Sequence, residues 1–196
     1  MKKLFERYPS LSVCQKDITN ALDAIIKTYN NGGKILVCGN GGSASDSEHI
    51  VGELMKGFII ERPVSDERIP EEIRKNLQGA LPAISLVSQS SLLSAYINDV
   101  DPEMVYAQLV YGYAKENDLL ICLSTSGNSK NVVCAAEVAK TLDIKTIALT
   151  GVNESRLSDI CDVTIRVPEK TTYKVQELHL PVYHYLCAAV EKHFFS

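Results

Sequence analysis

Two residues with complementary chemistry, His49 and Glu53, stand four positions apart in a segment patterned as a helix. Residues four apart share one helix face, so the imidazole and the carboxylate are expected to lie side by side. Such a pair can ligate a divalent metal ion or act as a general acid and base, and it is also common on exposed helix surfaces. The segment before the pair favours a chemical role.

A glycine-rich turn precedes the pair. The apolar run 35–38 predicts a buried parallel strand, and Gly39, Gly41 and Gly42 surround Asn40 in the turn that follows. Candidates for the N-cap of the next helix are Ser43, Ser45, Asp46 and Ser47. A strand, a glycine-rich turn and a helix N-terminus form an arrangement that binds anions. The spacing is neither a Walker A loop nor a GxGxxG turn, and a plain tight turn is the alternative.

A second unit of this kind lies further along the chain. The apolar run 119–123 predicts another buried strand, and a helix is predicted over 132–142. The turn between them consists of Ser124, Thr125, Ser126, Gly127, Asn128 and Ser129. Ligands bind at the carboxyl ends of parallel strands, and hydroxyl groups suit the oxygens of a phosphate. The repetition favours a phosphate site over a turn that only caps a helix.

The last predicted helix, 173–195, carries Gln176, His179 and His184. Gln176 and His184 are eight positions apart, about 12 Å of rise and about 80° of rotation on a straight helix. At that separation the two side chains cannot easily bind one ion, unless they lean toward each other or come from two chains. On geometry alone His179 is the closer partner of Gln176.

A scaffold must hold these residues in place. The sequence predicts five strands that alternate with helices, over 35–38, 81–87, 119–123, 146–149 and 163–167. This alternation predicts an α/β fold with a doubly wound, five-stranded parallel sheet flanked by helices. A helix over 17–30 precedes the alternation, and a helix over 90–97 is expected to break at Asn98 and Asp99. The chain reads as a single domain, 1–196. Segment 57–80 is polar and fits a surface insertion better than a lid.

Composition excludes some classes of partner. The 196 residues are 45% apolar and 22% charged with a net charge of −4, which favours neither nucleic acid nor an anionic membrane as partner. The first residues lack the apolar segment of a signal peptide, and no run approaches the roughly 20 apolar residues of a membrane span. Six scattered cysteines without a CxxC pair suit a reducing cytoplasm.

The motifs CGNGGS, His49-x-x-x-Glu53 and LSTSGNS resemble those of the SIS (sugar isomerase) domain. With Asn98-Asp99 and with Gln176 eight residues before His184, the sequence resembles the sedoheptulose 7-phosphate isomerases, or phosphoheptose isomerases, over nearly the whole chain. The resemblance implies isomerisation of an aldose and a ketose phosphate through an enediol, feeding heptose and lipopolysaccharide synthesis. It also implies a homotetramer in which N-terminal helices pack between subunits.

The resemblance further implies roles for individual residues. Glu53 and His184 would be the catalytic base and acid. One zinc ion per site would be bound by His49, Glu53, Gln176 and His184. The phosphosugar would contact Asn40, Gly41, Gly42, Ser43, Glu53, Asn98, Asp99, Ser124, Thr125, Ser126, Ser129 and Gln176.

The sequence departs from the family pattern in three places. Lys56-Gly57 stands where Gly-Arg is usual, Tyr173 replaces a commonly acidic residue, and segment 57–79 is longer. These departures bear on the identity of the sugar more than on the fold. Two other interpretations stay open: an isomerase of a different sugar phosphate, and a non-catalytic SIS module that binds a phosphosugar or a protein partner.

Overall fold

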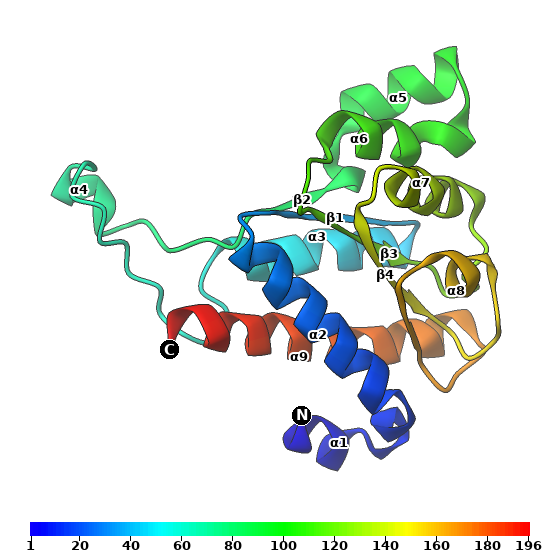
Figure 1. Ribbon diagram of the computed structural model, residues 1–196, viewed down its shortest axis with the longest axis horizontal. Coiled ribbons are helices and arrows are strands. Elements are labelled where there is room, and N and C mark those ends of the chain that lie inside the picture. The colour runs from blue at the N-terminus through cyan, green and yellow to red at the C-terminus, as the bar shows by residue number, and fades with distance from the viewer.

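Five short apolar runs form one parallel sheet in the computed structural model, which describes residues 1–196 (Figure 1). The strands are β1 (Ile35–Gly39), β2 (Ala83–Ser85), β3 (Leu119–Leu123), β4 (Lys145–Thr150) and β5 (Val163–Arg166). Every residue of β1 and β3 is buried because helices cover both faces of the sheet. The predicted doubly wound α/β fold is confirmed.

Alternating side chains of the strands divide the core into two layers. Ile35 and Val37 of β1 face a cluster shared with helices α1 (Lys2–Arg7), α2 (Gln15–Asn30), α3 (Gly42–Met55) and α9 (Thr172–Phe195). Leu36 and Cys38 face the opposite cluster, shared with α6 (Val105–Tyr113), α7 (Lys130–Thr141) and α8 (Arg156–Ile160). The remaining helix of this side, α5 (Ser90–Asp99), lies outermost against α6 (Figure 1).

The strand order is β2-β1-β3-β4-β5. From β1 the chain goes through α3 to β2 on one side, and then returns to β3 on the other side of β1. The direction of winding therefore reverses between β1 and β3, and ligands of doubly wound folds bind at the carboxyl ends of such strands. The two polar turns noted in the sequence both follow strands at this point.

Element boundaries differ from the sequence prediction in informative ways. The N-terminal helix over 17–30 is confirmed as α2, but α1 and a 3-10 turn (Pro9–Cys14) also precede it. Asn98 and Asp99 do not break α5 and are its last two residues. The predicted Ser and Asp N-caps of α3 are wrong, because the helix begins at Gly42 after Gly41, whose φ of 56° turns the chain without any side-chain cap.

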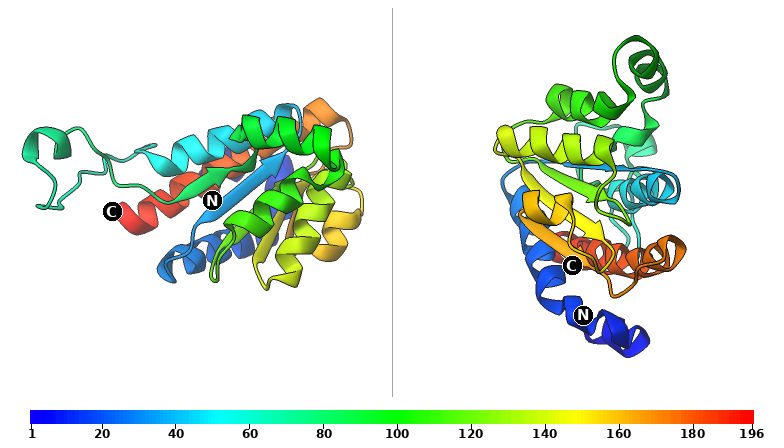
Figure 2. Two further views of the ribbon diagram at one scale, coloured as in Figure 1. Left: turned by 90° about the horizontal axis from the view of Figure 1, so that it is seen from above. Right: turned by 90° about the vertical axis from the view of Figure 1, so that its right-hand side faces the viewer.

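Segment 57–80 forms an arm between α3 and β2. Its short helix α4 (Glu71–Arg74) stands at the tip, beyond the body of the domain (Figures 1 and 2). The base of the arm is fixed by a fully buried ion pair between Arg62 and Glu191 of α9. Arg62 also donates to the carbonyl oxygens of Glu53 and Leu54 at the end of α3. The arm thus extends outward as a surface insertion whose base supports α3.

No helix is both long enough and apolar enough to cross a lipid bilayer.

Candidate active site

Two helix N-termini meet at the point where the winding reverses. Helix α3 begins three residues after β1 ends and α7 begins seven residues after β3 ends, while Gly39 and Leu123 pair across the two strands. Each N-terminus carries unpaired backbone N–H groups and the positive end of a helix dipole. The sheet therefore brings side by side the two turns for which the sequence predicts anion binding.

The Asn40 side chain is held in place between the two turns. Its amide exchanges two hydrogen bonds with the amide of Asn131, at 2.8 and 3.0 Å. Tyr106 donates its hydroxyl proton to the carbonyl oxygen of Gly39, 2.8 Å away. Sequence reasoning did not select Asn131, although its place two residues after Ser129, at the start of α7, was a signal. Asn40 is therefore presented rigidly to any ligand at this edge.

The hydroxyls of the second turn divide into two groups. Ser124 and Ser129 bond each other at 3.1 Å, whereas Ser126 accepts from the backbone N–H of Asn128. Gly127, at φ 66°, leaves room for the Ser155 side chain, which a Cβ would displace. A cleft of about 470 Å³ adjoins Asn40 and Ser129 between this edge and helix α5. Its volume is in the range of small-molecule sites.

Thr125 and Ser126 line a different hollow of about 240 Å³, together with Lys170 and Thr172. The predicted phosphate-binding hydroxyls are therefore on one turn but face two openings, except for Ser124, which is buried and bonds Ser129. The structure supports Ser129 most directly as a contact for a ligand in the larger cleft.

Three side chains from α3 and α9 meet at one point. His49 Nε2 lies 3.1 Å from Glu53 Oε1 and 3.4 Å from His184 Nε2. The Glu53 side chain is only 13% exposed. Burial and, to a smaller extent, the nearby His49 lower the pKa of His184 below its ordinary value, so its imidazole is neutral at physiological pH. The structure brings both predicted catalytic residues, Glu53 and His184, to His49.

Tyr183 and Asp46 lie behind this cluster. The Tyr183 hydroxyl is 3.1 Å from Asp46 Oδ1 and 3.0 Å from His49 Nδ1. Burial raises the pKa of Tyr183, with the Asp46 charge adding to it, and burial also raises the pKa of Asp46. Sequence reasoning treated Asp46 only as an N-cap and did not select Tyr183. The signal for Asp46 was its place three residues before His49, on the same helix face.

Gln176 and His179 make no hydrogen bond to this cluster. The amide of Gln176 lies against Gly42, where a Cβ would be only 2.7 Å from Nε2. His179, the closer partner on helix geometry, is fully buried, and its Nε2 bonds the carbonyl oxygen of Thr150 at 3.3 Å. His179 is therefore part of the core, and Gln176 belongs to the glycine-rich turn in this chain.

Asn98 and Asp99 are exposed on α5 and bond each other. No hydrogen bond joins them to the other candidate residues. Lys56, at the family's Gly-Arg position, places its ammonium group 3.3 Å from Glu53 Oε2. A cation thus flanks the predicted base.

The donors at His49 suit zinc. As placed, no group of three or more His, Cys, Asp or Glu side chains could hold a metal ion. Tetrahedral zinc with bonds of about 2.0–2.1 Å has ligand atoms about 3.3–3.4 Å apart, close to the 3.1 and 3.4 Å from His49 to Glu53 and His184. Two imidazoles, one carboxylate and an open position form a common catalytic zinc set. The donor chemistry and the two distances from His49 match those of a zinc site, but the three side chains as placed do not form one.

Comparisons with known proteins show what this chain is similar to. Residues 10–78 and 73–151 match the SIS domain family. The chain is 40% identical over 185 residues to phosphoheptose isomerase of Helicobacter pylori, covering 94% of this chain and 88% of that protein. It resembles the structure of phosphoheptose isomerase GmhA from Neisseria gonorrhoeae (TM-score 0.78, 29% identity, 95% and 94% covered). It also resembles a phosphoheptose isomerase from Francisella tularensis (TM-score 0.81, 30% identity, 95% and 91% covered).

Proposed function

The chain belongs to the phosphoheptose isomerase family of SIS domains, and from this premise we propose that it interconverts sedoheptulose 7-phosphate and glycero-manno-heptose 7-phosphate. The observation that carries the proposal is the meeting of His49, Glu53 and His184 on helices α3 and α9, with α3 itself starting at one of the two glycine- and serine-rich turns. A module that only binds a phosphosugar needs the turns but has no use for this cluster. The catalytic interpretation therefore outweighs the binding-module interpretation.

Glu53 is the base of the proposed reaction. Its carboxylate removes a proton from one of the two adjacent carbons of the sugar and returns it to the other, and an enediol forms in between. The neutral imidazole of His184 exchanges the proton of the neighbouring oxygen. Both groups lie within hydrogen-bond distance of His49 Nε2, so one small ligand can reach both.

The residues that would hold a zinc ion are His49, Glu53 and His184. When bound, zinc would polarise the carbonyl and hydroxyl oxygens of the sugar. We do not include Gln176 among these ligands, because its amide lies at the glycine-rich turn. There its role is contact with substrate, together with Asn40, Gly41, Gly42 and Ser43.

We place the phosphate of the substrate at the N-terminus of α7. The N–H groups of the first turn and the hydroxyls of the 124–129 segment offer hydrogen bonds to its oxygens. A cleft beside Ser129 and Asn40 opens next to this N-terminus.

We also propose that the active unit is a homotetramer in the cytoplasm. Asn98 and Asp99 are exposed and apart from the cluster within one chain, which suits a role at a subunit interface. Val13, Val100 and Tyr111 are large apolar side chains left exposed on the monomer. All six cysteines are free thiols, as expected in a reducing compartment.

A coupled assay on a panel of six- and seven-carbon sugar phosphates, with and without chelator, tests the function. We expect the highest kcat/KM for sedoheptulose 7-phosphate and a loss of turnover with chelator. Turnover of another sugar phosphate in its place would point to an isomerase of different specificity. Binding of a phosphosugar without any turnover, seen as a thermal shift with the same panel, would support the non-catalytic module.

A further inference from the structure

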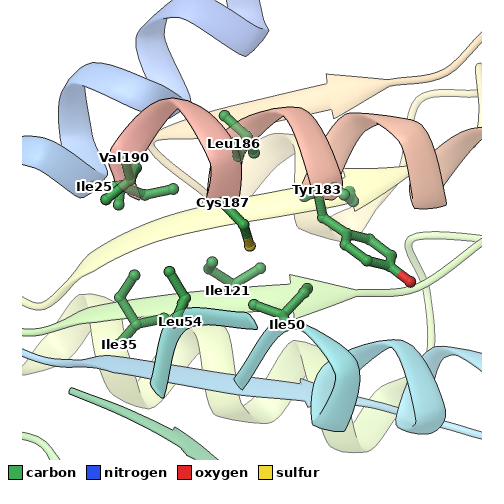
Figure 3. Close-up of a pocket in the computed structure, with 10 residues that line it drawn as sticks. Ile25, Ile35, Ile50, Leu54, Ile121, Tyr183, Leu186, Cys187 and Val190 are labelled. Atoms are coloured by element: carbon green, nitrogen blue, oxygen red, sulfur yellow. The ribbon is translucent and has the colours of Figure 1, made fainter. Parts of the chain in front are cut away.

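Tyr183 reaches from the apolar core to the polar cluster on α3. The residue is 2% exposed, and its ring lines a small cavity with apolar side chains from α3 and α9 (Figure 3). Ile50, Leu186 and Cys187 are among its neighbours there, and the hydroxyl points out of the cavity (Figure 3). The free space is only about 10 Å³, so the ring has little room to move. The core thus fixes the position of the hydroxyl.

The hydroxyl has one proton and two neighbours. Asp46 Oδ1 is 3.1 Å away and His49 Nδ1 is 3.0 Å away. An ionised carboxylate only accepts hydrogen bonds and is a stronger acceptor than a neutral imidazole nitrogen. The phenol therefore donates to Asp46, and its oxygen is left to accept from His49. This arrangement requires the proton of the neutral imidazole to be on Nδ1.

The opposite nitrogen of His49 then presents a lone pair. Nε2 faces Glu53 Oε1 at 3.1 Å and His184 Nε2 at 3.4 Å. Without the Tyr183 hydroxyl, the better hydrogen bond for His49 is from Nε2–H to the Glu53 carboxylate. In that tautomer the proton is on Nε2, where a lone pair is needed to bind a cation or to accept a proton from the substrate.

We propose that Tyr183 is a positioning residue that, through its bond to Asp46, holds His49 in the Nδ1–H tautomer with the Nε2 lone pair facing Glu53 and His184. The use of this lone pair in zinc binding rests on the proposed function, whereas the tautomer itself does not. Partners behind a metal-binding histidine fix its orientation, and their loss typically lowers metal affinity about 10–100-fold.

Tyr183→Phe tests the proposal because it keeps the ring in the cavity and removes only the hydroxyl. The tautomer of His49 is read from the ¹⁵N NMR signals of the imidazole in metal-free protein at about pH 8, above the usual pKa of histidine. We expect Nδ1–H in the wild type and Nε2–H in the variant. Zinc affinity, measured by competition with a chromophoric chelator, should fall about 10–100-fold.

Asp46→Ala provides a second, independent variant. Without the carboxylate, the Tyr183 proton is free to point at His49 Nδ1, so the same change to Nε2–H is expected although the tyrosine remains. A tyrosine that served only to fill the core would not produce this result. Tyr185→Phe is the matched control, because Tyr185 is on the same helix, partly buried and without a hydrogen bond, and it should change neither the tautomer nor zinc affinity.

The proposal is overturned if the wild type holds His49 as Nε2–H or doubly protonated, or if either variant keeps Nδ1–H. It is equally overturned if zinc affinity in Tyr183→Phe equals that of the wild type. A wild type without isomerase activity would defeat the proposed function and leave the tautomer result standing, so the two failures are distinguishable.

Discussion

The Nε2 atoms of His49 and His184 lie 3.4 Å apart although 135 positions separate the two residues in the chain. They meet because α3 and α9 pack side by side on the same face of the sheet. His49 Nε2 therefore lies close to a nitrogen of His184 and to a carboxylate oxygen of Glu53 at the same time. A shared proton or a bound cation can bridge contacts of this length, which makes the cluster the centre of the proposed chemistry.

We therefore expect one divalent ion per chain, zinc by preference, when the protein is purified without chelator. His49→Ala and His184→Ala should each lose the ion in elemental analysis. Gln176→Ala should retain it, because Gln176 contacts Gly42 and not the cluster. A loss in Gln176→Ala as large as in His184→Ala would show that Gln176 turns into the metal site, and full activity of metal-free enzyme would exclude a role for the ion.

Glu53→Gln should reduce kcat by about 10²–10⁴-fold, the usual contribution of a general base, while phosphosugar binding is spared. The amide keeps the shape of the side chain but cannot accept the proton. Glu48→Gln is the matched control, since Glu48 lies on the same helix, is exposed and accepts only from Ser88. Turnover at the wild-type rate in Glu53→Gln would remove Glu53 from the mechanism.

Much of the scaffold was predictable because each strand that carries the site is a continuous apolar run. The predicted strand over 119–123 coincides with β3, and the predicted helix over 17–30 lies within α2. The start of α3 was not predictable from its serines, because the conformation of Gly41 begins the helix instead. The hydrophobic pattern of the sequence thus predicts the helices and strands, while the backbone conformation of the turns decides where they begin.

The candidate site was predictable where its members share one helix face, as His49 and Glu53 do. The place of Gln176 required tertiary structure, because the sequence does not show that Gly42 leaves room for its amide. The same holds for Tyr183, whose ring reads as core while its hydroxyl reaches His49. Hydrophobic periodicity assigns such a residue to the core alone, although its polar atom also belongs to the candidate site.

Combining Ser124→Ala with Ser126→Ala should chiefly weaken substrate binding. Hydrogen bonds to a charged group contribute about 1.5–3 kcal/mol each, so the loss of two should raise KM roughly 100-fold or more, with a smaller change in kcat. Ser94→Ala, on α5 with a hydroxyl bonded only to its own helix, is the control. If KM for the double variant equals that of the wild type, the turn serves only to cap α7.

His179 makes stability depend on pH. Its burial lowers the pKa to about 4, against the smaller opposing effect of its bond to Thr150. The folded pKa is below the unfolded value of about 6.5, so this contribution is fully present above pH 6.5 and is lost as pH falls to about 4. The free energy of unfolding of the wild type relative to His179→Gln should therefore fall by about 3 kcal/mol over that range in denaturant titrations. A difference that does not vary with pH would mean that the pKa of His179 is the same in the folded and the unfolded protein.

The last prediction concerns which chain supplies which group. Glu53 and His184 both contact His49 within one chain, so subunits carrying Glu53→Gln and subunits carrying His184→Ala should not restore activity to each other when mixed. Asp99 is different, because it is exposed on α5 and no hydrogen bond ties it to the cluster. If a neighbouring subunit provides Asp99, mixing inactive Asp99→Ala with inactive Glu53→Gln subunits should regain part of the wild-type activity, since some interfaces then hold both intact groups.

Light scattering at micromolar concentration should give the mass of a tetramer for the wild type and both variants. A fully active monomer would contradict the assembly, whereas a tetramer whose Asp99 and Glu53 variants fail to complement would place both residues in the same subunit.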